Sequence, residues 1–195
     1  MQRAAARALS ILGHPLPVLM LTLLALAAHD RIATGTLLRM ALGFAAVAAI
    51  VVAYSRWRVR RGDWRHVDAS GIGERRHLNR FLLVVLLASA LLAAAGSQPR
   101  LATPLALSAL LVVLAMATAR WWKLSLHLAF AMFAAMSLLR ISWWAFAAMV
   151  AFAALLAWSR LQLARHAPRD LVAGACGGAI AGLLAWSSVP PHWQG

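Results

Sequence analysis

Residues 81–96 read FLLVVLLASALLAAAG and contain no charged side chain. Two other stretches share this property, MALGFAAVAAIVVAY at 40–54 and WAFAAMVAFAALLAW at 144–158. A soluble core does not need charge-free blocks of this length. A bilayer does, because its interior offers backbone amides no partner except those of their own helix. We therefore expect a membrane protein built from transmembrane helices.

The composition and the hydropathy pattern agree with this expectation. Of 195 residues, 63% are hydrophobic and 12% are charged, whereas a soluble domain carries about 25% charged residues. We predict an all-α, polytopic transmembrane helical bundle of six to seven spans, forming a single integral membrane domain over residues 1–195. The predicted spans cover 15–29, 36–54, 81–96, 101–118, 126–140, 142–158 and 171–188. The first imitates a secretory signal peptide, and an uncleaved span is the favoured interpretation.

The positively charged residues are unevenly distributed between the two faces of the predicted topology. The N-terminus, the loop 55–80, the connection 119–125 and the loop 159–170 fall on one face, which then carries all but four of the 19 Lys and Arg residues. The positive-inside rule makes this face cytoplasmic. The abundance of Arg, Ala and Trp is typical of a GC-rich bacterial genome, so we expect a bacterial inner membrane. Because the cations lie in short loops beside spans, the net charge of +14 favours membrane lipids and a phosphorylated lipid over nucleic acid.

The loop SRLQLARHAPRD at 159–170 holds the first group of residues suited to chemistry. His166 and Asp170 are four residues apart, so a helix would place them on one face, where a carboxylate can orient an imidazole. An imidazole oriented in this way is a nucleophile or a base. Arg160 offers a fork of donors that suits phosphate oxygens. On these residues alone, a basic juxtamembrane loop with a weak surface ion pair is an equal alternative.

Two further polar groups precede predicted spans. Lys123, Ser125 and His127 surround the start of the span at 126, where free amides, a hydroxyl and a cation suit phosphate. Arg75, Arg76 and Arg80 lie before the span at 81, where cations oppose the helix dipole unless an anion accompanies them. Interfacial anchoring is the alternative for both groups.

These residues resemble the signatures of a known family. Ser159-Arg160, five residues, His166, three residues and Asp170 match the third signature of the type 2 phosphatidic acid phosphatase superfamily, which also includes vanadium haloperoxidases. The second signature, Pro-Ser-Gly-His, is similar to Leu124-Ser125-Leu126-His127, with Ser and His matching. The first, Lys, six residues and Arg-Pro, has no literal match, and the cluster at 74–76 resembles a bacterial variant of it. The resemblance covers about 60–188.

The resemblance implies a phosphoryl transfer that uses no metal and no cofactor. His166 would attack phosphorus, Asp170 would orient His166, and His127 would protonate the leaving oxygen and later activate water. The phosphate oxygens would be held by Arg160, Ser125, Lys123 and the arginines Arg75, Arg76 and Arg80. The chain has five carboxylates and a single cysteine, Cys176, which suits a site that depends on fixed cations.

We therefore expect a phosphatase that acts on a lipid phosphate or an isoprenoid diphosphate. The alternatives are a lipid phosphotransferase and an inactive lipid-binding or transport protein of the same fold. Most members of the family hold the site on the outer face, but we adopt the cytoplasmic face from the charge pattern. Gly174, Gly178 and Gly182 are spaced for close helix approach within the bundle, and a homodimer through this face is the alternative.

Overall fold

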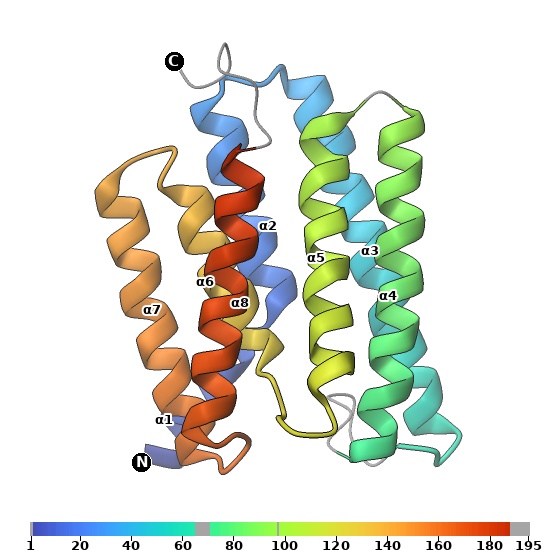
Figure 1. The fold of residues 1–195 in the computed structure, drawn as a ribbon. Helices are drawn as coiled ribbons and strands as arrows, with labels where there is room; N and C mark the ends of the chain where they lie inside the picture. Colours follow the sequence, from blue (N-terminus) through green and yellow to red (C-terminus); the bar gives the residue numbers. More distant parts are fainter. Residues whose placement is uncertain (1, 65–70, 97, 188–195) are drawn as a thin grey trace. The chain divides into compact units, whose positions relative to one another are not determined.

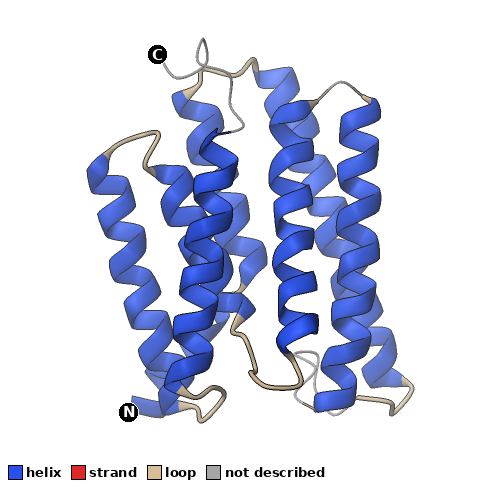
Figure 2. Ribbon diagram, viewed as in Figure 1, coloured by secondary structure: helices blue, strands red, loops and turns tan. Residues whose placement is uncertain are grey.

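The computed structural model describes residues 2–64, 71–96 and 98–187. These residues form eight α-helices and no β-strand (Figure 1, Figure 2). In chain order the helices are α1 (Gln2–Leu12), α2 (Pro15–His29), α3 (Thr34–Arg60), α4 (Ile72–Ala95), α5 (Pro99–Thr118), α6 (Leu126–Leu138), α7 (Trp143–Gln162) and α8 (Pro168–Ser187). The all-α class predicted from the sequence is confirmed.

Four of the helices are long and apolar enough to cross a membrane, namely α3, α4, α5 and α7. The pair α1 and α2 is bent by 54° and adds a fifth span if it is counted as one. The six to seven spans predicted from the sequence are therefore confirmed only in part. The helix α6 accounts for one difference, because its 13 residues extend only about 20 Å, less than the ~30 Å of a hydrocarbon core.

The predicted boundaries differ from the observed ones where helices carry charge. The loop predicted at 55–80 is shorter than expected, because α3 continues to Arg60 and α4 begins at Ile72. The first predicted span begins at residue 15, but residues Gln2–Leu12 also form a helix, α1. Hydropathy marks the part of a helix that suits hydrocarbon, whereas a helix continues into water as long as its backbone hydrogen bonds do.

The chain divides into two compact units, residues 1–33 with 117–195 and residues 34–116. The first unit is built around α6, which contacts α2, α7 and α8, while α1 contacts α7. The core of this unit contains Leu128 and Ala131 of α6, Ala153 and Leu156 of α7, and Leu171 of α8. The apolar sequence of α6 is thus explained by burial among other helices.

Glycines permit the closest helix contact in the first unit. A Cβ atom at Gly174 would lie 2.6 Å from the Ser125 carbonyl oxygen, and one at Gly178 would overlap the Ala129 carbonyl. Gly182 faces Met136 in the same way. The glycine face of α8 is therefore occupied by α6 of the same chain, which brings the start of α6 against the start of α8.

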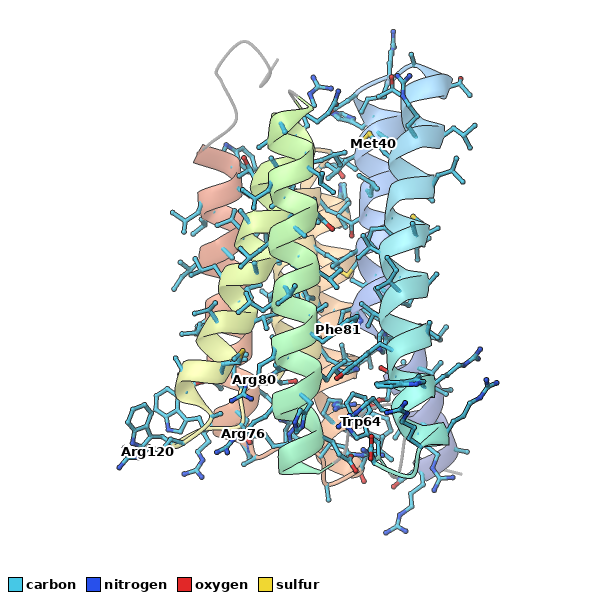
Figure 3. All side chains as sticks on the ribbon, turned by 90° about the vertical axis from the view of Figure 1, so that its right-hand side faces the viewer. Met40, Trp64, Arg76, Arg80, Phe81 and Arg120 are labelled. Carbon is cyan, nitrogen blue, oxygen red and sulfur yellow. The ribbon has the colours of Figure 1, made fainter. Side chains whose placement is uncertain are left out.

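The second unit carries an aromatic cluster near the end of α3, which we call the Tyr54 cluster: Tyr54, Trp57, Arg58, Arg61, Trp64 and Phe81. Tyr54 stacks on Phe81 of α4 with ring centroids 3.9 Å apart and meets Trp64 edge-on at 5.6 Å. Figure 3 shows Phe81 reaching from α4 toward α3. The Arg61 guanidinium lies 4.2 Å from the centroid of the Trp57 ring. Such a cluster is typical of an interfacial belt.

Candidate active site

The candidate site begins where two loops of the first unit meet, the segment before α6 and the turn before α8. The Ser125 N–H donates to the Asp170 carbonyl over 3.1 Å, and the Lys123 ammonium donates to the Arg165 carbonyl over 2.5 Å. Residues more than forty positions apart along the chain are therefore fixed side by side. The close approach of α8 to α6 at Gly174 makes this junction possible.

Asp170 is the buried residue that ties the two loops together. Its side chain is 7% exposed. One carboxylate oxygen accepts the Lys123 N–H over 3.1 Å, and the other accepts the Ala167 N–H over 3.0 Å. A carboxylate in the first turn of a helix satisfies amides that have no partner within the helix. Asp170 therefore stabilises the start of α8 and the segment before α6 together.

The hydrogen bonds of His166 define which of its nitrogens carries the proton. Its Nδ1 atom lies 2.9 Å from the Lys123 carbonyl oxygen. Because a carbonyl oxygen can only accept, Nδ1 must carry the hydrogen and donate it. In the neutral imidazole, Nε2 then holds the lone pair, and this atom lies 3.5 Å from a guanidinium nitrogen of Arg160. The Nε2 lone pair of His166 therefore faces the Arg160 guanidinium, which can only donate to it.

His166 is neutral over the physiological pH range. Burial, followed by the charges of Arg160 and Lys123, lowers the pKa of His166 to about 4, against the opposing effects of the Lys123 carbonyl and Asp170. The imidazole therefore retains its lone pair at neutral pH, as a nucleophile requires.

The resemblance implied that Asp170 orients the His166 ring directly. The nearest carboxylate oxygen lies 3.9 Å from Nδ1, which exceeds a hydrogen bond. The Lys123 carbonyl holds the ring in this structure, and Asp170 in turn holds the Lys123 amide. The carboxylate remains close enough to stabilise a positive charge on the ring.

Arg160 is positioned by the end of α7 and by a contact with α1. One guanidinium nitrogen donates to the Ser10 hydroxyl over 2.7 Å, and another faces His166. The helix ends with the Arg165 N–H donating to the Arg160 carbonyl over 3.0 Å, while Ala164 adopts a φ of +50°. This is the geometry of a Schellman motif, which turns the chain sharply after Arg160 and brings His166 back to it.

Ser125 and His127 occupy the start of α6. The Ser125 side chain is fully buried, and its hydroxyl has no hydrogen-bond partner within the described part of the chain. A buried hydroxyl without a partner is costly unless a ligand satisfies it. The His127 ring lies edge-on to the His14 ring, with centroids 5.4 Å apart. Ser125, whose N–H is bonded to the Asp170 carbonyl, thus adds a hydroxyl to this junction, and His127 adds an imidazole two residues further along the chain.

The three arginines expected to complete the site lie in the second unit. Arg75, Arg76 and Arg80 belong to the first turns of α4, whose start is capped by a 2.8 Å hydrogen bond from the Gly71 N–H to Glu74. Arg76 and Arg80 are exposed and leave α4 on a different side from Phe81 (Figure 3). The site described above consists of first-unit residues, which we call the His166 site: Lys123, Ser125, His127, Arg160, His166 and Asp170.

Sequence reasoning missed two residues that the structure places at this site. Ser10 holds Arg160, and His14 contacts His127. No motif marks Ser10. For His14, the following proline was the signal in the sequence, because His14-Pro15 marks the break between α1 and α2. His14 caps α2 there by accepting the Leu16 N–H over 3.3 Å.

The structure thus combines four to five helices that are long and apolar enough to span a membrane with a cluster in which buried His166 and Asp170 lie beside Arg160. In the part of the chain that the structure describes, no three His, Cys, Asp or Glu side chains are grouped as metal ligands would be. Comparisons with protein-family models, with curated proteins and with solved structures found no match.

Proposed function

We propose that this protein is a membrane phosphatase that removes phosphate from a lipid phosphate or an isoprenoid diphosphate. The observation that carries the proposal is the state of His166, a neutral imidazole whose Nε2 lone pair faces the Arg160 guanidinium. A phosphoryl group bound by Arg160 would present its phosphorus to that lone pair. Phosphoryl transfer depends mainly on such positioning and on fixed charge.

The proposed reaction has two displacements. The Nε2 lone pair forms a bond to phosphorus while the bond from phosphorus to the lipid oxygen breaks, and His127 gives that oxygen a proton. Bound phosphate favours the protonated form of His127 through its negative charge. Water then attacks phosphorus and returns a proton to His127, the nitrogen–phosphorus bond breaks, and inorganic phosphate leaves.

The remaining residues of the His166 site stabilise the charges that develop. The phosphorylated ring is cationic, and its Nδ1–H remains bonded to the Lys123 carbonyl beside the Asp170 carboxylate. The Ser125 hydroxyl donates to a phosphate oxygen, which would satisfy this buried group. Arg75, Arg76 and Arg80 of α4 are proposed as phosphate-binding residues of the second unit.

The proposed setting is the cytoplasmic membrane of a bacterium, with the site on the cytoplasmic face. The exposed apolar side chains of α3 and α4, such as Leu42, Ile50, Val84 and Leu91, support burial of these helices in lipid. We also propose that α6 and α8 lie within the embedded bundle, which would give six to seven spans. Labelling of a cysteine introduced at Gln162, in a Cys176→Ala background, tests which side of the membrane the site faces. If the site is cytoplasmic, only a reagent that crosses the membrane should react with this cysteine in intact cells.

The function is tested by phosphate release from phosphatidic acid, phosphatidylglycerophosphate and prenyl diphosphates in EDTA, beside His166→Ala. We expect release from at least one substrate, unaffected by EDTA and abolished by the substitution. Loss of activity in EDTA would contradict the metal-free chemistry. Transfer of the phosphoryl group to an added alcohol in place of water would favour the phosphotransferase, and binding without turnover would favour a lipid-binding protein.

A further inference from the structure

The amphipathic helix α1 lies beside the end of α7 (Figure 1). Two side-chain contacts join it to the last turn of α7. The Ser159 hydroxyl donates to the Ala6 carbonyl over 2.6 Å, and both residues are fully buried. One turn further along α1, the Ser10 hydroxyl accepts from Arg160 over 2.7 Å. The first contact anchors the helix, and the second reaches a side chain of the His166 site.

The contact with Ser10 constrains the direction of the Arg160 side chain. A guanidinium is planar, so fixing one terminal nitrogen restricts where the other can point. In Arg160 the fixed nitrogen is bonded to Ser10, and the other faces Nε2 of His166 at 3.5 Å. An arginine without this restraint has several rotatable bonds and loses entropy when it binds phosphate.

We propose that Ser10 of α1 is a positioning residue for phosphoryl transfer, which acts by holding Arg160 in the orientation that meets phosphate at His166. This inference rests on the proposed function. It assigns the N-terminal helix a part in the active site, which Ser10 plays through Arg160. The packing of Gly13 against Leu156 of α7 fixes the end of α1 at the same place.

The test is a set of variants measured by phosphate release. Ser10→Ala should lower kcat roughly tenfold, the size expected from losing one hydrogen bond to a charged group, with little change in KM for the lipid. Ser10→Thr retains the hydroxyl and should restore most of the rate. Ser137→Ala removes a hydroxyl that donates to the Phe133 carbonyl one turn earlier in α6, and it should leave kcat unchanged.

A double-mutant cycle separates positioning from a structural role. If Ser10 acts through Arg160, then Ser10→Ala should change the residual rate of Arg160→Ala less than about twofold. The inference would be overturned if Ser10→Ala lowered the rate tenfold both in the wild type and in Arg160→Ala, or if it caused no loss in the wild type. Neither result would affect the proposed phosphatase activity. If the wild-type protein itself releases no phosphate, the proposed function fails and the role of Ser10 fails with it.

Discussion

The His166 site and the Tyr54 cluster use the same residue types in different ways. In the His166 site, the guanidinium nitrogens of Arg160 face a hydroxyl oxygen and a ring nitrogen with a lone pair. In the Tyr54 cluster, Arg61 lies over the face of Trp57, and Arg58 forms a 3.0 Å ion pair with the half-exposed Asp63. In the first arrangement, Ser10 orients Arg160 so that its other N–H group faces the ring nitrogen of His166. The second anchors a helix end at an interface.

This difference is tested most strongly by removing one arginine from each region. Arg160→Ala should lower kcat by a factor of about 10² to 10³, because it deletes a donor to the charge that develops on phosphorus. Arg61→Ala should change kcat less than about twofold and stability by about 0.5–1 kcal/mol, the size of an exposed cation–π contact. Phosphate release and thermal unfolding measure the two effects. Equal losses of rate would remove the distinction between the regions.

A glycine substitution in each unit tests whether the His166 site depends on close helix packing. Gly174→Ala places a Cβ 2.6 Å from the Ser125 carbonyl, so the loop must move. We expect a loss of about 1–3 kcal/mol in unfolding free energy and at least a tenfold loss of rate. Gly43→Ala on α3 meets nothing within 4 Å and should stabilise the helix by up to about 1 kcal/mol. Thermal unfolding of the two variants in detergent compares their stabilities. A Gly174→Ala variant as stable and as active as the wild type would contradict the packing argument.

The protonation of His166 predicts a pH dependence of stability. In the unfolded chain a histidine titrates near 6.5, whereas the pKa of His166 in the folded protein is lowered to about 4. Below pH 6.5 the unfolded state therefore binds more protons, and stability should fall as the pH falls from about 6.5 to about 4. Melting temperatures of the wild type and His166→Gln across this range provide the measurement. The same slope in both proteins would show that His166 is not buried in its neutral form.

The smallest expected effect concerns two helix ends. Ala164 after α7 and Gly62 after α3 both have positive φ, at +50° and +77°. Ala164→Gly relieves a conformation that L side chains avoid and should stabilise the protein by about 1 kcal/mol or less, whereas Gly62→Ala should destabilise it by a similar amount. Chemical unfolding of the two variants measures both signs. Matching signs would contradict the assigned backbone conformations.

The sequence predicted the helical class because charge-free blocks leave a chain no other way to satisfy its amides in lipid. The predicted boundaries of α2, 15–29, agree with the observed helix. The spans were harder to count, because an apolar run such as α6 reads the same whether lipid or protein surrounds it. Only the three-dimensional contacts of α6 with α2, α7 and α8 distinguish these cases.

The candidate site, like the fold, could be predicted from the sequence only in part. The four-residue spacing of His166 and Asp170 predicted that they share one helix face. Their side chains do lie 3.9 Å apart, but His166 belongs to the turn before α8, and the structure ties Lys123 and Ser125 to the two residues. The sequence could not show that a backbone carbonyl of Lys123, not Asp170, holds the His166 ring, since every residue carries a carbonyl. It also could not identify Ser10, whose contact with Arg160 joins positions 150 residues apart.

The central claim is that Nε2 of His166 forms a bond to phosphorus, and trapping the intermediate tests this most directly. The protein is mixed with a phosphate-labelled lipid substrate and quenched in alkali, where phosphohistidine survives and an acyl phosphate does not. Peptide mapping and nuclear magnetic resonance then locate the label. The structure predicts phosphate on Nε2 of His166, because Nδ1 is bonded to the Lys123 carbonyl. A label on another residue or on Nδ1, or turnover without any label, would contradict it.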